Sequence, residues 1–229
     1  MGALHPLDRP VWHALATRQE EFALGSEKAR RIVPTCGMFA AAADNSLESQ
    51  MALASLIPEG DQLWLVEPQA VDPPPGARIV HRATMNQMVL PTKLLLSPTF
   101  AAIALRDSDA EEMQALALLT EPGPFLSETH KLGDFFGIRD SGRLVAMAGE
   151  RLKPPGFTEV SAVCTHPDHR GRGYAGGLMR LVIERIQARG ETAFLHVYPH
   201  NEKAIALYRE LGFVFRRTLT LTVIAHQGF

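Results

Sequence analysis

One stretch of the sequence constrains the fold more than any other, because it combines a strand pattern, a glycine-rich turn and a helix start. Residues 157–165 have the pattern of a strand, Gly171 and Gly173 follow, and an apolar stripe typical of a helix runs from Tyr174 to Arg189. Glycine adopts backbone dihedrals that other residues avoid, and it lets a ligand approach the main-chain amides. The sequence therefore predicts a strand–loop–helix unit whose helix begins at the loop.

The chemistry of this turn suits a diphosphate. The first turn of a helix presents free N–H groups and the positive end of the helix dipole, and Arg170 and Arg172 add charged, forked donors. A turn that merely connects a strand to a helix is the structural alternative. The P-loop pattern is absent, and the spacing of Gly171, Gly173 and Gly177 does not fit the dinucleotide-binding GxGxxG pattern, which disfavours phosphoryl and hydride transfer.

The bulk properties exclude several kinds of partner. A chain of 229 residues with 46% hydrophobic and 21% charged residues has room for one large domain or two small ones. Its formal net charge of -2 gives no field that would attract nucleic acid or an anionic membrane. No apolar run reaches the roughly 18 residues of a membrane span, and Met1–Pro10 lacks the apolar stretch of a secretory signal. We expect no nucleic-acid and no membrane partner.

The cysteines and histidines give no sign of a disulfide framework or a metal site. The two cysteines, Cys36 and Cys164, form no CxxC pair, so the reducing cytoplasm is the expected compartment. Among the nine histidines the closest pair is His166 and His169, and Pro167 between them indicates a turn rather than the helix of an HExxH zinc site. We expect no metal.

The remaining patterns predict an α/β chain in two parts. The N-terminal part, residues 1–95, has helical patterns at 8–22, with Asp8 as N-cap, and at 47–56, short apolar runs at 38–43 and 63–66, and a proline-rich loop at 73–76. The C-terminal part, residues 100–229, shows strand patterns at 103–106, 135–139, 144–150, 157–165, 194–198 and 213–224, and helical patterns at 108–119, 174–189 and 201–211.

Three motifs resemble the GNAT superfamily of N-acetyltransferases. Arg170-Gly171-Arg172-Gly173-Tyr174-Ala175 matches its Arg/Gln-x-x-Gly-x-Gly/Ala signature, and Val163-Cys164-Thr165-x-Pro167 is similar to the strand before it. Asn201-x-x-Ala204-x-x-x-Tyr208-x-x-x-Gly212-Phe213 resembles a second block of that family. The resemblance covers about residues 103–224. The first hundred residues match only loosely, and they are similar to two-part members such as glycine N-acyltransferase-like proteins.

The resemblance implies a fold and an activity. The fold is an α/β (α+β) acyl-CoA N-acyltransferase fold, with a mixed, mostly antiparallel sheet flanked by helices, an N-terminal α/β half, and a sheet that splays where residues 157–165 and 194–198 separate. The activity is transfer of an acetyl group from acetyl-CoA, as cosubstrate, to a primary amine by direct attack in a ternary complex. A small-molecule or amino-acid acceptor is favoured over a protein lysine, and the protein is expected to be a monomer or a homodimer.

The resemblance also assigns residues to acetyl-CoA. Main-chain groups of Val163, Cys164 and Thr165 would pair with the pantetheine arm. Asn201 would anchor the same arm, and Ala204 would leave room for it. The amides of the turn would hold the diphosphate, a group that comprises Arg170, Gly171, Arg172, Gly173, Tyr174, Ala175 and Gly176.

Two side chains are expected to move protons. Tyr208 is assigned as the general acid for the departing thiolate, and its structural alternative is an aromatic side chain packed in the core. Glu159 is the leading general base, because strand alternation places it on the face of Val163, and apolar neighbours would raise its pKa. Its alternative is a structural carboxylate paired with an arginine. Ser161 and His196 are weaker candidates, and a free amine of modest pKa would need no base.

Three other functions are alternatives to this activity. A non-catalytic acyl-CoA-binding sensor would use the same fold, but it would not need Tyr208, Asn201 and Glu159. A protein N-acetyltransferase differs only in its acceptor. Nucleic-acid binding through the arginines is disfavoured, because these lie on separate elements without interleaved aromatic side chains, at Arg170, Arg172, Arg216 and Arg217.

Overall fold

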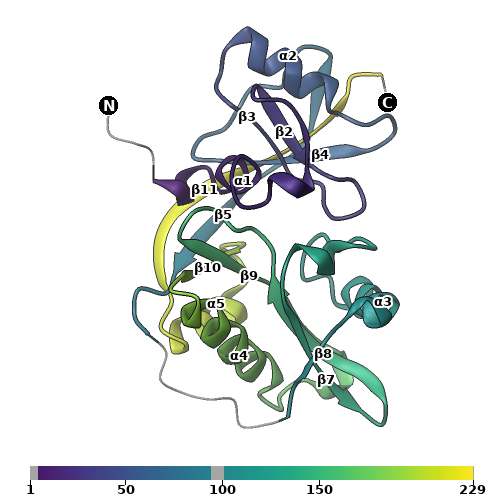
Figure 1. Cartoon of the computed structure of the whole chain (residues 1–229), viewed down its shortest axis with the longest axis vertical. Coiled ribbons are helices and arrows are strands. Elements are labelled where there is room, and N and C mark those ends of the chain that lie inside the picture. Colours follow the sequence, from purple (N-terminus) through teal and green to yellow (C-terminus); the bar gives the residue numbers. More distant parts are fainter. Residues whose placement is uncertain (1–4, 94–100, 229) are drawn as a thin grey trace.

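A computed structural model of the chain describes residues 5–93 and 101–228. One eight-stranded sheet runs through both parts of the chain, in the order β4-β11-β5-β10-β9-β8-β7-β6 (Figure 1). Its strands are β4 (Gln62–Glu67), β5 (Ala77–Val89), β6 (Ile103–Ala104), β7 (Phe135–Asp140), β8 (Arg143–Glu150), β9 (Phe157–Thr165), β10 (Thr192–Val197) and β11 (Val214–His226). The mixed α/β architecture with a mostly antiparallel sheet is therefore confirmed.

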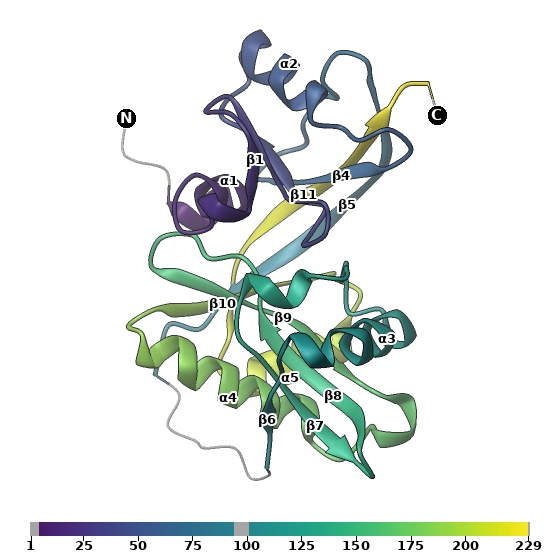
Figure 2. The ribbon, with the colours of Figure 1, turned by 45° about the vertical axis from the view of Figure 1, so that its right-hand side comes forward.

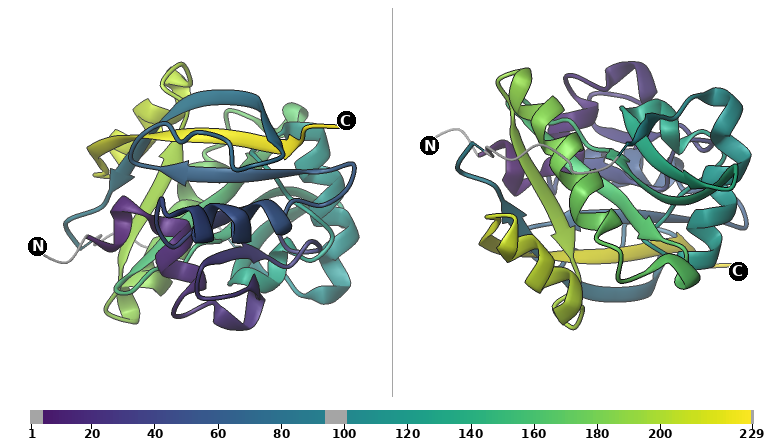
Figure 3. Two further views of the ribbon diagram at one scale, coloured as in Figure 1. Left: turned by 90° about the horizontal axis from the view of Figure 1, so that it is seen from above. Right: turned by 90° about the horizontal axis from the view of Figure 1, so that it is seen from below.

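The N-terminal part adds a small sheet and two helices to this framework. The small sheet has the order β1-β2-β3, with β1 (Ala23–Gly25), β2 (Ala29–Ile32) and β3 (Ala40–Ala42). Helices α1 (Pro10–Leu15) and α2 (Leu47–Ser55) lie on one side of β11, which Figure 3 shows in yellow. Strand β5 of the N-terminal part pairs with β10 and β11 of the C-terminal part, so the two parts share the large sheet. The boundary predicted between residues 95 and 100 falls largely on residues outside the described ones.

Three helices of the C-terminal part flank the sheet. They are α3 (Ala110–Thr120), α4 (Tyr174–Ala188) and α5 (Glu202–Glu210). Helix α4 buries the stripe predicted from its periodicity, and its Leu178, Val182 and Ile186 are 0% exposed in the cluster formed with β7, β8 and β10. Helix α3 packs in a different cluster, with β7, β8 and β9. The two helices therefore cover opposite faces of these strands (Figure 2).

Short 3₁₀ turns connect several elements. They are η1 (Pro6–Asp8), η2 (Glu20–Phe22), η3 (Asp107–Asp109), η4 (Thr129–Leu132) and η5 (Pro167–His169). The last of these is the turn predicted from Pro167, directly before the glycine-rich segment.

The sheet opens between β9 and β10. These strands are parallel, and their ladder pairs Thr192 with Phe157, Ala193 with Thr158 and Phe194 with Glu159. The ladder ends there, while β9 continues to Thr165 along β8 and β10 continues to Val197 along β5. The splay predicted for these two strands is therefore confirmed.

A bulge interrupts β9 inside the splay. Ala162 has φ 51°, in the left-handed region that side chains other than glycine rarely adopt. Opposite it the register jumps, because Ser161 pairs with Gly149 and Cys164 pairs with Met147. Between these two pairs β9 advances by three residues and β8 by two, so β9 contains one extra residue, which is the geometry of a β-bulge.

The bulge overturns the predicted alternation of β9. Val160 and Val163 both pack in the α4 cluster, whereas Ala162 and Cys164 pack in the α3 cluster. Simple alternation had placed Val163 on the face of Glu159 and opposite Val160. The extra residue reverses the faces from position 162 onward, so Glu159 and Val163 lie on opposite sides of the sheet.

One helix prediction for the N-terminal part was wrong, and one long strand was not predicted. The helix predicted over 8–22 is limited to α1, with Arg9 rather than Asp8 as N-cap, and the following chain bends so that the buried Gln19 amide bonds to Leu132, Arg151 and Lys153. Strand β5 was not predicted, because its exposed polar residues mask the strand pattern.

Candidate functional site

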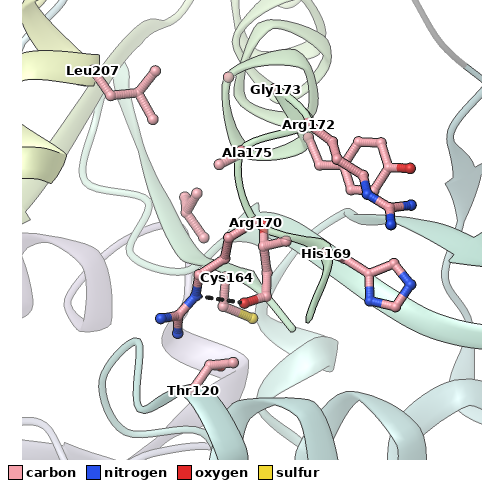
Figure 4. Close-up of a pocket in the computed structure, with 13 residues that line it drawn as sticks. Thr120, Cys164, His169, Arg170, Arg172, Gly173, Ala175 and Leu207 are labelled. Atoms are coloured by element: carbon pink, nitrogen blue, oxygen red, sulfur yellow. Dashed lines mark hydrogen bonds between the residues drawn. The ribbon is translucent and has the colours of Figure 1, made fainter. Parts of the chain in front are cut away.

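The glycine-rich turn opens onto a pocket of about 380 Å³. Its walls come from the end of β9, the η5 turn, the first turn of α4, the last residue of α3 and one residue of α5 (Figure 4). The lining residues are Thr120, Val163, Cys164, Thr165, His169, Arg170, Gly171, Arg172, Gly173, Tyr174, Ala175, Gly176 and Leu207. The pocket thus gathers all the residues that the sequence assigned to the turn and to the adjoining strand.

Two glycines shape the floor of the turn. Gly171 has φ 79° and Gly173 has φ 76°, and a Cβ placed on either would meet no atom within 4 Å. Glycine is therefore favoured by the backbone conformation and not by lack of space. Gly173 is the N-cap of α4, and the Gly177 N–H donates to its carbonyl at 3.1 Å. The N–H groups before Gly177 have no acceptor inside the helix and are available to an anion.

The pocket carries positive charge and unused polar atoms. Arg170 and Arg172 are exposed at its rim, where Arg170 donates to the Thr165 carbonyl at 3.4 Å and Arg172 lies 3.8 Å from Asp140. Among the described residues, the buried atoms Thr165 Oγ1 and His169 Nδ1 have no hydrogen-bond partner. Free amides, two arginines and two unpaired polar atoms fit a ligand that carries a diphosphate and a polar arm.

Two predicted pantetheine contacts do not line this pocket. Asn201 uses its Oδ1 to accept from the Ala204 N–H at 3.2 Å, and it thereby caps α5. Ala204 packs against the α4 cluster. Leu207 is the α5 residue that reaches the pocket (Figure 4).

Cys164 is a buried wall residue of the pocket. Its thiol contacts the Thr120 side chain, and burial raises the pKa of the thiol to about 11. The thiol is therefore protonated at neutral pH, and a nucleophilic thiolate is not favoured.

Tyr208 follows Leu207 on α5 and is not among the residues that line the pocket. Its ring packs against Phe213, with centroids 6.2 Å apart, and against the α4 cluster. Burial raises the pKa of the phenol to about 12. The hydroxyl is thus protonated at neutral pH, as a general acid must be, although the raised pKa also makes it a weaker acid than a free phenol.

Glu159 lies on the last rung before the splay. The prediction that its pKa is raised was wrong, because the pKa is lowered. The carboxylate is buried, and Arg151 binds both of its oxygens at 2.9 Å. His196 Nδ1 lies 2.7 Å from Oε1. Desolvation favours a higher pKa, but the Arg151 charge and the bonds from His196 and Arg151 outweigh it, so the pKa of Glu159 is well below its usual range.

Arg151, the partner of Glu159, was not identified from the sequence. Its backbone N–H donates to the Glu159 carbonyl, because β8 and β9 form an antiparallel hairpin in which Glu150 faces Val160. A count of residues across the loop between 150 and 157 would have placed an arginine beside Glu159. Thr120, His169 and Leu207 were also not assigned to the pocket.

Within residues 5–93 and 101–228, no group of three or more histidine, cysteine and acidic side chains could hold a metal ion. In the same residues, none of the helices has the length and apolar character required to cross a membrane.

The C-terminal part of the sequence matches a protein family and a known relative. The family described as FR47-like protein matches residues 135–221. The N-alpha-acetyltransferase RimI of Mycobacterium tuberculosis is 39% identical over 82 residues, which is 34% of this chain and 51% of that protein. The chain therefore spans only about half the length of this relative.

Solved structures extend the similarity to the whole chain. A protein from Novosphingobium aromaticivorans, described as an acetyltransferase from the GNAT family, superposes with a TM-score of 0.91 and 47% identity over 97% of this chain and 99% of that chain. A GCN5-related N-acetyltransferase from Kribbella flavida shares the fold, with a TM-score of 0.59 and 20% identity over 94% of this chain and 95% of that one. The chain belongs to the GNAT family of acetyltransferases.

Proposed function

We propose that the protein transfers the acetyl group of acetyl-CoA to the primary amine of a small molecule or an amino acid, by direct attack in a ternary complex. The observation that carries this proposal is that the β9 end, the Arg170–Gly176 turn and the start of α4 line one common pocket. Family membership supports the reaction type, and the geometry supports the placement of the donor.

The pocket offers complementary groups to each part of acetyl-CoA. The turn amides and the two rim arginines would bind the diphosphate. Beyond the bulge, the main-chain groups of Val163, Cys164 and Thr165 border the splay, so they would pair with the amides of the pantetheine arm. Thr165 Oγ1 is an unpaired polar atom that the arm could satisfy.

The reaction needs few protein groups beyond correct placement. The neutral amine nitrogen attacks the thioester carbonyl carbon, a C–N bond forms, and the C–S bond breaks. We propose that Tyr208 donates the proton that the departing thiolate takes up, since its phenol is protonated at neutral pH.

The surroundings of Glu159 favour a positioning role over the expected role of general base. A carboxylate with a lowered pKa and both oxygens bound by Arg151 is a weak base. We propose that Glu159 instead positions Arg151 beside the splay. The proton of the acceptor then leaves through water, which suits an amine of modest pKa.

A second acceptor is favoured by one observation. The segment similar to RimI spans 82 residues at 39% identity, and that protein is named as an N-alpha-acetyltransferase. A protein N-terminus is therefore the competing acceptor, and an acyl-CoA sensor without turnover is the non-enzymatic alternative.

The proposal is tested by thiol release from acetyl-CoA with a panel of amines, amino acids and peptides. We expect turnover with at least one small amine, and Tyr208→Phe should lower it. Turnover with peptides alone would establish the protein acceptor. Tight binding of CoA without turnover on any acceptor would establish the sensor.

A further inference from the structure

A line of hydrogen-bonded side chains crosses the sheet at the splay. It joins residues from the N-terminal half to the end of β8, in the order Asp8, Arg216, Gln87, His196, Glu159 and Arg151. The central members Gln87, His196 and Glu159 lie on the neighbouring strands β5, β10 and β9, and their side chains are buried. The line ends at the Arg151 guanidinium.

Gln87 determines which nitrogen of His196 carries the proton. Gln87 Nε2 donates to the Leu7 carbonyl at 2.8 Å, and its Oε1 accepts from Arg216 at 2.9 Å, so the amide has a single orientation that satisfies both. His196 Nε2 lies 3.2 Å from the same Gln87 nitrogen and must therefore accept. The proton of the neutral ring is then on Nδ1 and is donated to Glu159.

This arrangement uses the full capacity of the Glu159 carboxylate. Oε1 accepts from Arg151 Nη2 and His196 Nδ1, while Oε2 accepts from Arg151 Nε and lies 3.4 Å from the Leu152 N–H. No lone pair is left to face a substrate. What the line holds in place is the plane of the guanidinium.

Arg151 keeps one donor group free. Its Nε and Nη2 bind Glu159, whereas Nη1 has no hydrogen-bond partner among the described residues, and the side chain as a whole is 13% exposed. Nη1 lies near Gly123, in the loop after α3, because a Cβ added to Gly123 would lie 3.9 Å from it. The guanidinium also lies over the Phe39 ring, 4.7 Å from its centroid. The free donor is thus held rigidly from two sides.

The free donor lies where β9 and β10 begin to separate, because Arg151 binds Glu159 at the last rung of their ladder. Gly123 is three residues after Thr120, which lines the pocket of the glycine-rich turn. Glu159, which holds Arg151, is on the last rung before the strands separate. Tyr198, just past the end of β10, is close enough that the Arg151 charge opposes the rise in the pKa of its phenol caused by burial. This is the side of β9 opposite Val163 and α4.

Building on the proposed function, we propose that Arg151 Nη1 binds the carboxylate of the acceptor, so that the acceptors are amino acids. An arginine N–H and a carboxylate form a charge-assisted hydrogen bond. The restraints on Arg151 mean that little side-chain entropy is lost when it binds. In an amino acid the carboxylate is one carbon from the amine, so this contact sets the position of the nucleophile. A peptide N-terminus has an uncharged amide in place of that carboxylate.

The test compares acceptors that differ only at the carboxylate. For each of several side chains, kcat/KM is measured for the free amino acid, its amide and its decarboxylated amine. Arg151→Lys removes the planar fork and should lower the preference for the acid over the amide about 10- to 100-fold, the range for a hydrogen bond to a charged group. The comparison between variants cancels the different amine pKa values, which belong to the acceptors.

A matched control separates recognition from damage to an ion pair. Arg9 binds Glu67 through Nε and Nη2 at 2.7 and 2.9 Å, the same pattern that Arg151 makes with Glu159. Arg9→Lys should leave the acid-to-amide preference unchanged. An equal preference in wild type and Arg151→Lys, or a wild type that favours amides and peptides, would overturn the inference.

A measurement on the wild type alone covers the case in which Arg151→Lys does not fold. N-acetyl amino acids have no amine to titrate, and they should inhibit at least about tenfold more strongly than their amides if a charged contact forms. Equal inhibition would overturn the inference. Thiol release with decarboxylated amines would still support the acetyltransferase, so the two proposals fail separately.

Discussion

The Arg151 guanidinium binds both oxygens of the Glu159 carboxylate at 2.9 Å, at the rung where β9 and β10 begin to separate. The pair joins the end of β8 to the splay, and His196 adds a third hydrogen bond. Replacing both partners of such a buried ion pair changes the stability of the fold little, whereas removing one partner destabilises it because a buried charge is left unpaired. This asymmetry governs the first prediction.

Glu159→Gln should destabilise the fold by about 3 kcal/mol at pH 7, because Arg151 would keep its charge without a counter-ion. The folded pKa of Glu159 is lowered, so its stabilisation is complete above the unfolded value of about 4.3 and is lost as the pH falls through the folded value. Urea unfolding from pH 7 to pH 3 should show the two proteins converging below about pH 4.3. A constant difference down to pH 3 would contradict the lowered pKa.

A control for this prediction removes both charges. Arg151→Met combined with Glu159→Gln should recover part of the stability lost in Glu159→Gln alone, since no buried charge is left unpaired. Additive losses would show that the two side chains do not interact.

Tyr208→Phe should lower kcat about 100-fold at saturating acetyl-CoA, which is the range for a single general acid. The ring contact with Phe213 is kept, so the unfolding free energy should change by less than about 0.5 kcal/mol. Steady-state kinetics and urea unfolding measure the two quantities. An unchanged kcat would remove Tyr208 from the mechanism.

The pH dependence of kcat offers a separate test of the same residue. A general acid works only while protonated, and the pKa of Tyr208 is raised to about 12. We expect no alkaline decline in kcat from this group up to about pH 10.5, a margin of more than one unit below that pKa. A decline near pH 9 that disappears in Tyr208→Phe would contradict the raised pKa.

Gly173→Ala should weaken CoA binding about tenfold, because the methyl group disfavours φ 76° and displaces the amides that we propose bind the diphosphate. Gly190, after the end of α4, has φ 75° and equally open surroundings, so Gly190→Ala is a matched control. Both variants should lose about 1 kcal/mol of stability. Equal CoA affinity in both variants would show that the turn does not bind CoA.

Local patterns in the sequence predicted the strand, turn and helix that line the pocket. Helix α4 and the turn before it depend on periodicity, glycine and capping within one continuous segment, and the structure has strand β9 at the residues predicted. The residues of the turn also line one pocket, as their spacing indicated.

Non-local pairing explains what the sequence did not predict. The bulge at Ala162 depends on register with β8, and a one-residue shift exchanges the faces of everything after it. The partner of Glu159 comes from a neighbouring strand, so apolar sequence neighbours gave the wrong direction for its pKa. Strand β5 is paired on both sides, although polar residues interrupt the apolar residues along its sequence.

The central claim is that the Arg170–Gly176 turn binds the diphosphate of a CoA thioester. Calorimetric titration of the wild type with CoA and with pantetheine, which lacks the diphosphate, tests it most directly. We predict saturable CoA binding and pantetheine binding at least about 100-fold weaker, since several charge-assisted hydrogen bonds are lost. No heat with CoA, or equal affinity for both compounds, would contradict it.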